Sequence, residues 1–339
     1  MSSSLKILVL RTDNLGDLIL TLPALRHLRQ TLPQAEISVV IKAPFHKLFQ
    51  TYLGSLDIKM FRVEEPWDRQ EWSACLALYC NFKEAFRVLR SGAKLRVGTY
   101  SQIWSFFLLN KGLRQKRSLA EKSEALYTLE LAELLTQVFK VSAKADSSPV
   151  LLPAEPDALN VAEEKLESLG VKKGESFFVL HPGMAGSALN LEASHYLEVI
   201  EKLSAKSTVL ISVGPGSQDQ VLWSELSEKR KDLKKLEGLD LSSLKEVFRK
   251  SRTVIAPSTG PLHLAAAVGV PTVGLYSPIK SHHPIRWAPW GGAVRMKILF
   301  PQVVCPANRQ CWGKKCRNYN CMDQLQWGSL ILEAINGLT

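Results

Sequence analysis

The sequence predicts an α/β protein with two doubly wound, Rossmann-like domains that face a central cleft. Its 339 residues exceed the length of about 250 at which a single core stops growing efficiently. Short β-rich runs alternate with segments of helical periodicity, and a stretch rich in Ser, Ala and Pro at 142–157 separates two such series. We therefore expect a first domain at 1–150 and a second at 151–339, whose last helix could pack back on the first.

The two halves repeat the same alternation of elements. In the first half the expected strands are 6–11, 36–42, 58–63 and 74–81, and the expected helices are 15–25, 43–53 and 82–92, the last ending at Gly92. In the second half the expected strands are 176–182, 207–214, 253–258 and 271–278, and the expected helices are 191–204, 241–250 and 260–269. Strands separated by helices predict parallel pairing with right-handed crossovers, and ligand sites beyond the carboxyl ends of the strands.

The composition excludes several classes of protein. Apolar residues make up 46% and charged residues 22% of the chain, which is typical of a globular protein and not of a disordered or fibrous one. The N-terminus has no pattern of a secretory signal, and no apolar run reaches the ~18 residues of a membrane-spanning helix. We therefore expect a cytoplasmic protein.

Positive charge is concentrated in two segments. Residues 247–322 contain eleven Lys and Arg and no Asp or Glu, and residues 83–117 contain nine Lys and Arg against the single acid Glu84. Such segments favour an anionic partner. A nucleotide diphosphate, a nucleic acid or an anionic membrane surface would each supply the negative charge.

Three polar loops that contain glycine follow predicted strands. They read "RTDNLGD" at 11–17, "HPGMAGSALN" at 181–190 and "APSTGP" at 256–261. In the third loop, Ser258 or Thr259 can cap a helix that opens at Gly260, so that free backbone N–H groups and the positive helix end form a seat for an anion. In the second, Gly183, Gly186 and Ser187 would let the backbone approach a phosphate. A cap or a tight turn without any ligand is the alternative for both loops.

Several other nucleotide-binding and hydrolytic motifs do not occur. The loop "VGPGSQD" at 213–219 contains a partial G-x-G without the third glycine, and neither a phosphate-binding G-x-x-x-x-G-K-[ST] loop nor a G-x-S-x-G elbow is present. There is also no Asp-x-Asp pair to hold a divalent metal against a diphosphate. An enzyme can instead neutralise a departing diphosphate with helix N-termini and with Lys or Arg.

Four motifs together resemble one enzyme family. "ILVLRTDNLGDLILTLPAL", "HPGMAGSALN", "APSTGPLHLAAAVGVPTVGLYSP" and "CPANRQCWGKKCRNYNCM" resemble, in order and spacing, the motifs of glycosyltransferase family 9, the lipopolysaccharide heptosyltransferases. The resemblance implies a GT-B architecture and inverting, metal-independent transfer of heptose from ADP-heptose to the lipopolysaccharide inner core. No cofactor is expected beyond the ADP-sugar donor.

The resemblance also implies roles for the residues of the first loop. The aspartate of the Gly-Asp pair is the proposed general base of the family, and Asp17 occupies that position, whereas Asp13 belongs to the turn. A carboxylate can take the proton of an acceptor hydroxyl as that hydroxyl attacks the anomeric carbon. The alternative for Asp17 is an interaction with the dipole of the helix that it begins.

Donor binding is expected in the second domain and acceptor binding in the first. The expected donor residues are Gly183, Met184, Gly186, Ser187, Asn190, Ser258, Thr259, Gly260 and His263. The expected acceptor or cleft residues are Arg11, Thr12, Asn14, Gly16, Lys111, Arg114, Lys116 and Arg117. A packed or capping histidine is the alternative for His263, and turn chemistry is the alternative for Thr12.

The sequence departs from the family at two places in the second domain. Ser258 stands where many members have an aspartate before Thr-Gly. The sequence therefore does not determine which sugar is transferred. "ALNLE", with Asn190 and Leu191, stands where many members have Lys or Arg followed by Trp-Pro.

The basic residues that follow "IWSFFLL" at 103–109 join an apolar segment to a cationic one. This pairing suits a lipid A-core acceptor at the anionic inner-membrane surface, and the alternative is an ordinary solvated loop. We expect a monomer, peripheral to that membrane, that does not bind nucleic acid.

Six cysteines without an export signal are expected to be reduced thiols. Cys75 and Cys80 lie in an apolar run and are expected to pack as small hydrophobic residues. Cys305, Cys311, Cys316 and Cys321 have the spacing C-x5-C-x4-C-x4-C, which lacks the C-x2-C pairs typical of zinc sites. Structural thiols are the expectation here, and metal binding is the alternative.

Two other functions remain open on the sequence alone. One is a family 9 transferase that uses another nucleotide sugar or another acceptor. The second, of a different class, is a non-enzymatic nucleic-acid-binding protein, which the positive charge and the cysteines would suit.

Overall fold

The computed structural model describes residues 5–79, 81–141, 143–146, 148–184, 189–291 and 295–338. The chain forms two compact units: unit 1 comprises Met1–Arg117 and Lys122–Pro153, and unit 2 comprises Ser118–Glu121 and Ala154–Thr339. The passage from unit 1 to unit 2 after Pro153 falls inside the stretch rich in Ser, Ala and Pro. The end of that stretch is already helical, because Pro156 begins a helix in a position where its missing N–H costs nothing.

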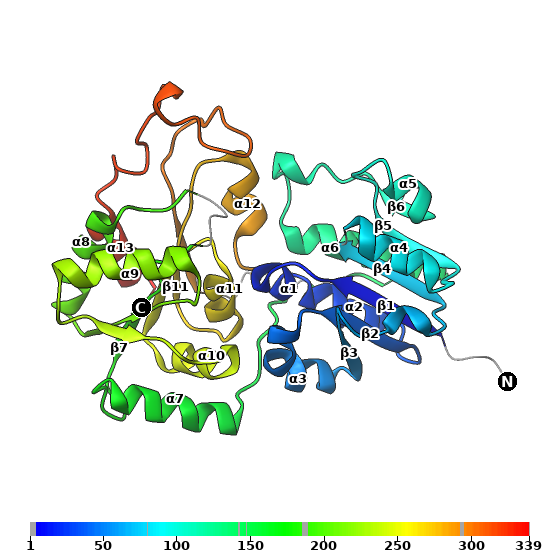
Figure 1. The fold of residues 1–339 in the computed structure, drawn as a ribbon, viewed down its shortest axis with the longest axis horizontal. Coiled ribbons are helices and arrows are strands. Elements are labelled where there is room, and N and C mark those ends of the chain that lie inside the picture. The colour runs from blue at the N-terminus through cyan, green and yellow to red at the C-terminus, as the bar shows by residue number, and fades with distance from the viewer. Residues whose placement is uncertain are drawn as a thin grey trace. The chain divides into compact units, whose positions relative to one another are not determined.

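Unit 1 is built on a parallel sheet of six strands in the order β3-β2-β1-β4-β5-β6 (Figure 1). The strands are β1 (Lys6–Arg11), β2 (Glu36–Ile41), β3 (Ile58–Arg62), β4 (Ala74–Tyr79), β5 (Leu95–Thr99) and β6 (Lys111–Leu113). β1 lies between β2 and β4 and is buried from Ile7 onward, which explains its nearly continuous apolar sequence. The carboxyl ends of β1 and β4 form the switch point of this sheet, where the strand order reverses.

The helices of unit 1 include the three that were expected, one of them with a correction, and two that were not expected, over 105–108 and 124–138. They are α1 (Leu15–Ile19), α2 (Leu22–Thr31), α3 (His46–Ser55), α4 (Phe82–Arg90), α5 (Ser105–Leu108) and α6 (Glu124–Val138), and α6 packs on α2. The helix expected over 15–25 is two helices, because Pro23 favours the first turn of a new helix and α2 therefore begins at Leu22. Gly92 follows α4 with a φ of 72°, the left-handed conformation that suits glycine after a helix.

Unit 2 is built on a second parallel sheet of six strands in the order β12-β11-β10-β7-β8-β9. Its strands are β7 (Phe177–Leu180), β8 (Thr208–Ser212), β9 (Lys234–Leu236), β10 (Thr253–Pro257), β11 (Thr272–Leu275) and β12 (Met296–Leu299). β7 pairs with β10 although two other strands separate them in the sequence. The carboxyl ends of β7 and β10 are therefore the switch point of unit 2.

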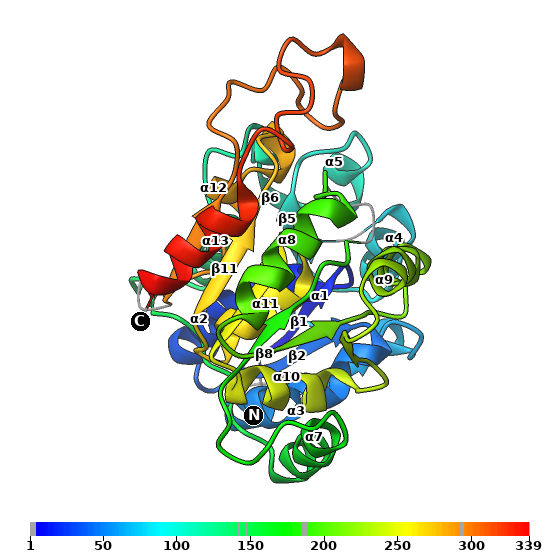
Figure 2. The same ribbon diagram turned by 90° about the vertical axis from the view of Figure 1, so that its left-hand side faces the viewer.

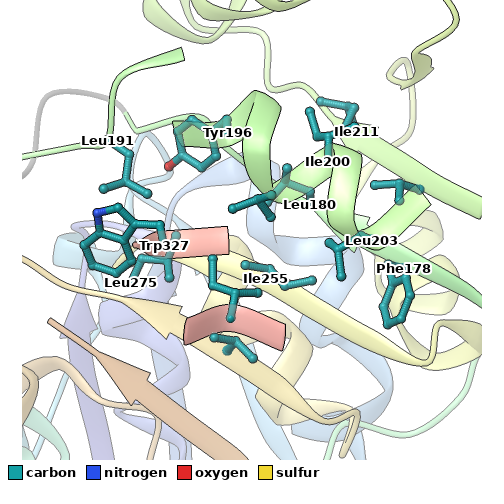
Figure 3. Packing of buried hydrophobic residues seen from close by; sticks show 14 of the residues in the cluster. Phe178, Leu180, Leu191, Tyr196, Ile200, Leu203, Ile211, Ile255, Leu275 and Trp327 are labelled. Atoms are coloured by element: carbon teal, nitrogen blue, oxygen red, sulfur yellow. The ribbon is translucent and has the colours of Figure 1, made fainter. Parts of the chain in front are cut away.

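The helices of unit 2 are α7 (Pro156–Ser168), α8 (Ala193–Ser204), α9 (Ser217–Lys229), α10 (Leu241–Lys250), α11 (Gly260–Ala267), α12 (Pro284–Trp287) and α13 (Trp327–Asn336). An apolar cluster of this unit joins the sheet to α8 and α13, and Tyr196, Ile255 and Trp327 lie within it with no exposed surface (Figure 3). α13 packs against α8 inside unit 2 (Figure 2), whereas the sequence left open a return to the first domain.

The two parallel sheets confirm the predicted fold class, two Rossmann-like domains of the kind found in GT-B enzymes. Within the described residues, no helix is both long and apolar enough to cross a bilayer.

Candidate functional site

The switch point of unit 1 is occupied by a buried arginine surrounded by carboxylates. Arg11 ends β1, and its side chain has no exposed surface. Its Nε lies 3.0 Å from Asp13 Oδ1, and its Nη2 donates to Asp17 Oδ1 at 2.8 Å. A buried guanidinium requires such partners, since an unpaired charge in the interior is strongly destabilising. Arg11 therefore holds Asp13 and Asp17 side by side, which supports a positioning role for a residue that the sequence placed among the acceptor or cleft contacts.

A third carboxylate, Glu124, completes this cluster. Its Oε1 accepts a hydrogen bond from Arg11 Nη2 at 3.3 Å and another from Arg117 Nη1 at 2.7 Å, and its side chain is 1% exposed. Arg117 also donates from both Nε and Nη2 to Gln115 Oε1. The guanidinium of Arg117 is thus bound by protein groups, which supports a structural role for a residue that the sequence placed among the acceptor contacts.

Asp13 does more than turn the chain. Burial raises the pKa of its carboxyl, the Arg11 charge opposes this effect, and the nearby Asp17 charge adds to it, which brings the pKa of Asp13 to about 7. The side chains of Asp13 and Asp17 are each 13% exposed, so both border solvent at the end of the strand. The expectation that Asp13 serves only the turn is therefore incomplete, because its carboxylate belongs to the same ionic cluster as Asp17.

The remaining first-loop residues occupy different environments. Thr12 is buried, and its Oγ1 has no hydrogen-bond partner within the described part of the chain. Asn14 is exposed and precedes α1 without a side-chain capping bond, while Gly16 is buried inside that helix. Besides the two carboxylates, Thr12 and Asn14 are therefore polar side chains of this loop that a substrate could engage.

Near the switch point of unit 2, the loops after β7 and β8 come together. The backbone N–H of His181, just after β7, donates to Ile255 O of β10 at 2.9 Å. Gly183 and Gly214, which follow β7 and β8, both adjoin the Asp219 carboxylate, and a Cβ on either glycine would overlap it. Burial raises the pKa of Asp219, and the backbone amides of Gly214 and Met184 oppose that rise. Gly186 and Ser187, expected to contact the donor, lie outside the described residues.

The helix after β10 begins at Gly260 as expected, but neither expected hydroxyl caps it. The Thr259 side chain makes no capping bond, because its hydroxyl donates to Pro257 O at 3.1 Å. Ser258 instead interacts with the Tyr276 hydroxyl. The predicted side-chain cap is thus wrong, and the first-turn N–H groups of α11 are left for another acceptor.

Two histidines of unit 2 are neutral at physiological pH. Burial lowers the pKa of His263, in the first turn of α11, to about 4, and His263 Nδ1 has no partner among the described residues. Burial likewise lowers the pKa of His181 to about 4, and its Nδ1 lies 3.2 Å from Ser212 Oγ. An imidazole at His263 can therefore exchange a hydrogen bond with a ligand but supplies no positive charge to a diphosphate.

Asn190 shapes the loop after β7 through its amide group. Its Oδ1 accepts from the Leu191 N–H at 2.9 Å and from the Tyr196 hydroxyl at 2.6 Å, and its Nδ2 donates to Pro182 O at 2.9 Å. These bonds indicate a positioning role at a residue that the sequence placed among the donor contacts.

Sequence reasoning missed two acids at these sites. Glu124 follows the capping residue Ser123 at the start of α6, and Asp219 lies in the first turn of α9. Both resemble ordinary acids near a helix N-terminus in the sequence. Only the buried basic partner of Glu124 and the glycine contacts of Asp219 set them apart.

Three of the basic residues expected on the acceptor side are exposed in the unit that also carries an exposed apolar surface. Lys111, Arg114 and Lys116 are exposed. In the same unit, Ile103 is 82% exposed and Phe107 is 76% exposed. The Phe82 ring of α4 meets Trp104 edge to face with centroids 6.1 Å apart, and α4 packs on α5. We call the exposed apolar side chains of α4, of α5 and of residue 103 the α4–α5 patch; they are Phe82, Phe86, Leu89, Ile103, Phe106 and Phe107.

The described cysteines are free thiols. Cys75 is fully buried in β4, as expected of a small hydrophobic residue, and Cys80 lies outside the described residues. Across the described ranges, no three His, Cys, Asp or Glu side chains are already placed to share a metal ion.

Comparison with known proteins identifies the family. The family model of glycosyltransferase family 9 (heptosyltransferase) matches residues 68–315. A protein of Haemophilus influenzae that is provisionally named a glycosyltransferase is 28% identical over 301 residues, which cover 84% of this chain and 86% of that protein. Lipooligosaccharide heptosyltransferase 2 of Campylobacter jejuni is 24% identical over 333 residues, which cover 95% of each chain.

A solved structure shares the fold. ADP-heptose lps heptosyltransferase II of E. coli superimposes with a TM-score of 0.71 at 19% identity, over 98% of each chain. The family match begins after the Arg11–Asp17 loop and so does not cover it. Because the family model spans most of the chain, the protein belongs to glycosyltransferase family 9 and is a glycosyltransferase with two Rossmann-like domains.

Proposed function

We propose that this protein transfers a heptose from ADP-heptose to the inner core of lipopolysaccharide, with inversion at the anomeric carbon and with Asp17 as the general base. The observation that carries the proposal is the Arg11–Asp17 contact at the switch point of unit 1. It fixes a partly exposed carboxylate at the position in an α/β sheet where ligands bind. The heptosyltransferase names of the relatives support the sugar and the acceptor.

In the proposed reaction, an Asp17 carboxylate oxygen takes the proton of the acceptor hydroxyl as its oxygen forms a bond to the anomeric carbon. The bond between that carbon and the phosphate oxygen of the donor breaks, and ADP leaves from the opposite face, so the anomeric configuration inverts. The hydroxyl is a weak nucleophile at neutral pH, so a positioned base contributes typically 10²–10⁴-fold to the rate.

We place the leaving ADP at the switch point of unit 2. The first-turn N–H groups of α11 are not capped by a side chain, and a helix N-terminus favours a phosphate. Gly183 lets the loop after β7 pack against the Asp219 carboxylate, and neutral His263 can exchange a hydrogen bond with the diphosphate. The N-terminus of α11 supplies positive potential where charge develops, which supports a transfer step without a metal ion.

We place the glycolipid acceptor on unit 1, with the α4–α5 patch against the inner leaflet of the membrane. Unit 1 exposes both these apolar side chains and Lys111, Arg114 and Lys116, a combination that suits a surface of acyl chains and anionic headgroups. The protein would act as a monomer at the cytoplasmic face.

The role of Asp17 is tested with Asp17→Asn, which keeps the shape and removes the basic oxygen. We expect transfer to fall by on the order of 10²–10⁴-fold, while the rise in melting temperature caused by ADP stays as in the wild type. Asp232→Asn, which changes an exposed acid of unit 2, is the matched control and should transfer normally. Near-normal turnover in Asp17→Asn would remove Asp17 as the base, and loss of transfer in Asp13→Asn alone would move that role to Asp13.

The donor and the class of function are tested with a thermal-shift series of ADP, UDP, GDP and a DNA oligonucleotide. Selective stabilisation by ADP supports the proposal. A selective response to UDP or GDP would indicate another nucleotide sugar, and a salt-dependent response to DNA alone would favour nucleic-acid binding. Mass spectrometry of lipopolysaccharide from cells that lack the protein then identifies the missing sugar.

A further inference from the structure

Unit 2 contains a cavity of about 250 Å³ at the end of its sheet where the strands begin. Thr253, the first residue of β10, and Pro271, which precedes β11, both line it. The proposed diphosphate site lies at the other end of β10, and the five residues of that strand span about 16 Å. The cavity is therefore separate from the site proposed for the donor.

Three arginines line this cavity, and none of its described lining residues is acidic. Arg249 lies in the last turn of α10, Arg252 directly precedes β10, and Arg295 directly precedes β12. Because β11 lies between β10 and β12, the backbones of Arg252 and Arg295 are two strand spacings apart, about 10 Å. Two arginines on either side of β11 can thus contact the same small ligand.

The charge of Arg249 is balanced by a buried ionic network of unit 2. Its Nε lies 2.9 Å from Glu246 Oε2, and Glu246 Oε1 lies 3.3 Å from Lys245 Nζ. The same Lys245 Nζ lies 2.9 Å from Glu155 Oε1. The side chains of Lys245 and Glu246 have no exposed surface, and the two acids of the network cancel its two bases. Arg249 is therefore a fixed part of the cavity wall and adds no excess charge.

Arg252 and Arg295 supply the excess positive charge of the cavity. Both are exposed, and the described residues give neither side chain a hydrogen bond or an ion pair. The Arg252 guanidinium lies over the Phe178 ring, 5.6 Å from its centroid, a contact that leaves its N–H groups unused. Helices α10 and α11 both end at the cavity, and their dipoles together place about one negative charge there. About one positive charge therefore remains for a ligand.

We propose that the cavity lined by Arg249, Arg252 and Arg295 binds one phosphate group, either as a free anion or as part of a small ester or a lipid headgroup. A guanidinium presents a planar set of N–H donors that matches two phosphate oxygens, so Arg252 and Arg295 would each hold one side of the group. Pockets for whole organic molecules usually exceed roughly 300 Å³, so this cavity accommodates the phosphate and only a few atoms beyond it. The site is independent of the proposed transfer step.

The test titrates inorganic phosphate into the full chain at constant ionic strength and follows the melting temperature. Phosphate stabilises proteins in general by exclusion from their surface, so the diagnostic result is a saturable rise that depends on the arginines. In the double variant Arg252→Gln, Arg295→Gln we expect the affinity for phosphate to fall about tenfold or more, because charge-assisted hydrogen bonds are lost. The matched control Arg309→Gln removes an exposed arginine that does not line the cavity and should respond like the wild type.

A second measurement identifies the source of the phosphate. Vesicles of phosphatidylcholine with and without phosphatidic acid are sedimented with each protein. Weaker binding of the double variant to the phosphatidic acid vesicles assigns the site to a lipid headgroup, and equal binding assigns it to a soluble phosphate compound. The proposal is overturned if phosphate produces no saturable rise in the wild type, if the rise is the same in the double variant, or if Arg309→Gln lowers it as much.

Discussion

At the scale of single residues, Arg11 determines how the candidate site is arranged. Its fully buried guanidinium binds Asp13, Asp17 and Glu124. The spacing in the sequence predicts that Asp13 and Asp17 lie near the end of a strand, but it does not predict that one arginine joins them. Glu124 is 113 positions from Arg11 and could not be connected with it before the fold was known.

Arg11→Lys tests whether this arrangement matters for catalysis. The ammonium of lysine is a point charge and cannot span three carboxylates as the planar guanidinium does. We expect a rate lower by on the order of 100-fold, because a small displacement of a catalytic group can cost that much. The ADP-induced thermal shift should change little. Initial rates at saturating donor and acceptor provide the measurement, and an unchanged rate would show that Asp17 does not depend on Arg11.

Asp13 makes stability depend on pH in a defined direction. The pKa of its carboxyl is about 7 in the folded protein, above the value of 3.8 for a free side chain, so the folded state binds more protons than the unfolded state between these values. The contribution of Asp13 to the free energy of unfolding therefore falls as the pH rises from about 4 to about 7 and is constant above that range.

Asp13→Asn should remove this dependence, because asparagine stays neutral. We expect the variant to gain stability relative to the wild type at pH 8 and to lose that advantage towards pH 5. Urea unfolding at several pH values measures the difference. Parallel curves for the two proteins would show that Asp13 titrates normally.

At the scale of elements, buried apolar strands were easier to predict than short strands and helix boundaries. β1, β7 and β10 are buried apolar runs, and each appears near its expected position. β6 and β9 have three residues each and carry lysine, so no apolar run indicated them. The leucine periodicity predicted one long first helix, but Pro23 favours the first turn of a new helix, so the structure has two helices there.

The convergence of the loops after β7 and β8 can be tested with Gly183→Ala. The new Cβ would overlap the Asp219 carboxylate, so backbone or carboxylate must move, and overpacking of this kind costs about 1–3 kcal/mol. We expect a lower melting temperature and weaker ADP binding. Gly54→Ala is the matched control, since no atom lies within 4 Å of a Cβ at that glycine of α3. Equal behaviour of the two variants would show that the contact with Asp219 is not restrictive.

At the scale of the whole molecule, composition indicated the kind of partner but not where each charge acts. The basic region at 83–117 contains Arg87 and Arg117, and both are used in ion pairs within unit 1. Exposed lysines and arginines of the same region lie in the unit that carries the α4–α5 patch. Net charge alone cannot tell the basic residues that form internal ion pairs from those that stay exposed. The difference depends on which acidic residues the fold brings close to each of them.

The α4–α5 patch should bind membranes. The double variant Ile103→Ser, Phe107→Ser removes two of its most exposed side chains, and we expect its partition onto anionic phosphatidylglycerol vesicles to fall about tenfold or more, in line with a few kcal/mol for two large apolar side chains. Vesicle co-sedimentation measures this. Val221→Ser changes an exposed apolar residue of α9 in unit 2 and should bind like the wild type. Equal binding of all three proteins would exclude the patch as the membrane contact.

The packing of α13 on α8 also has a consequence for how the protein is made. Trp327 and Ile331 of α13 complete the apolar cluster that covers one face of the unit 2 sheet, and they follow every strand of that sheet in the chain. During synthesis the core of unit 1 can form early. One face of the unit 2 sheet stays exposed until α13 has left the ribosome. A pause in translation before α13 would therefore lengthen the exposure of this apolar surface to chaperones and to aggregation.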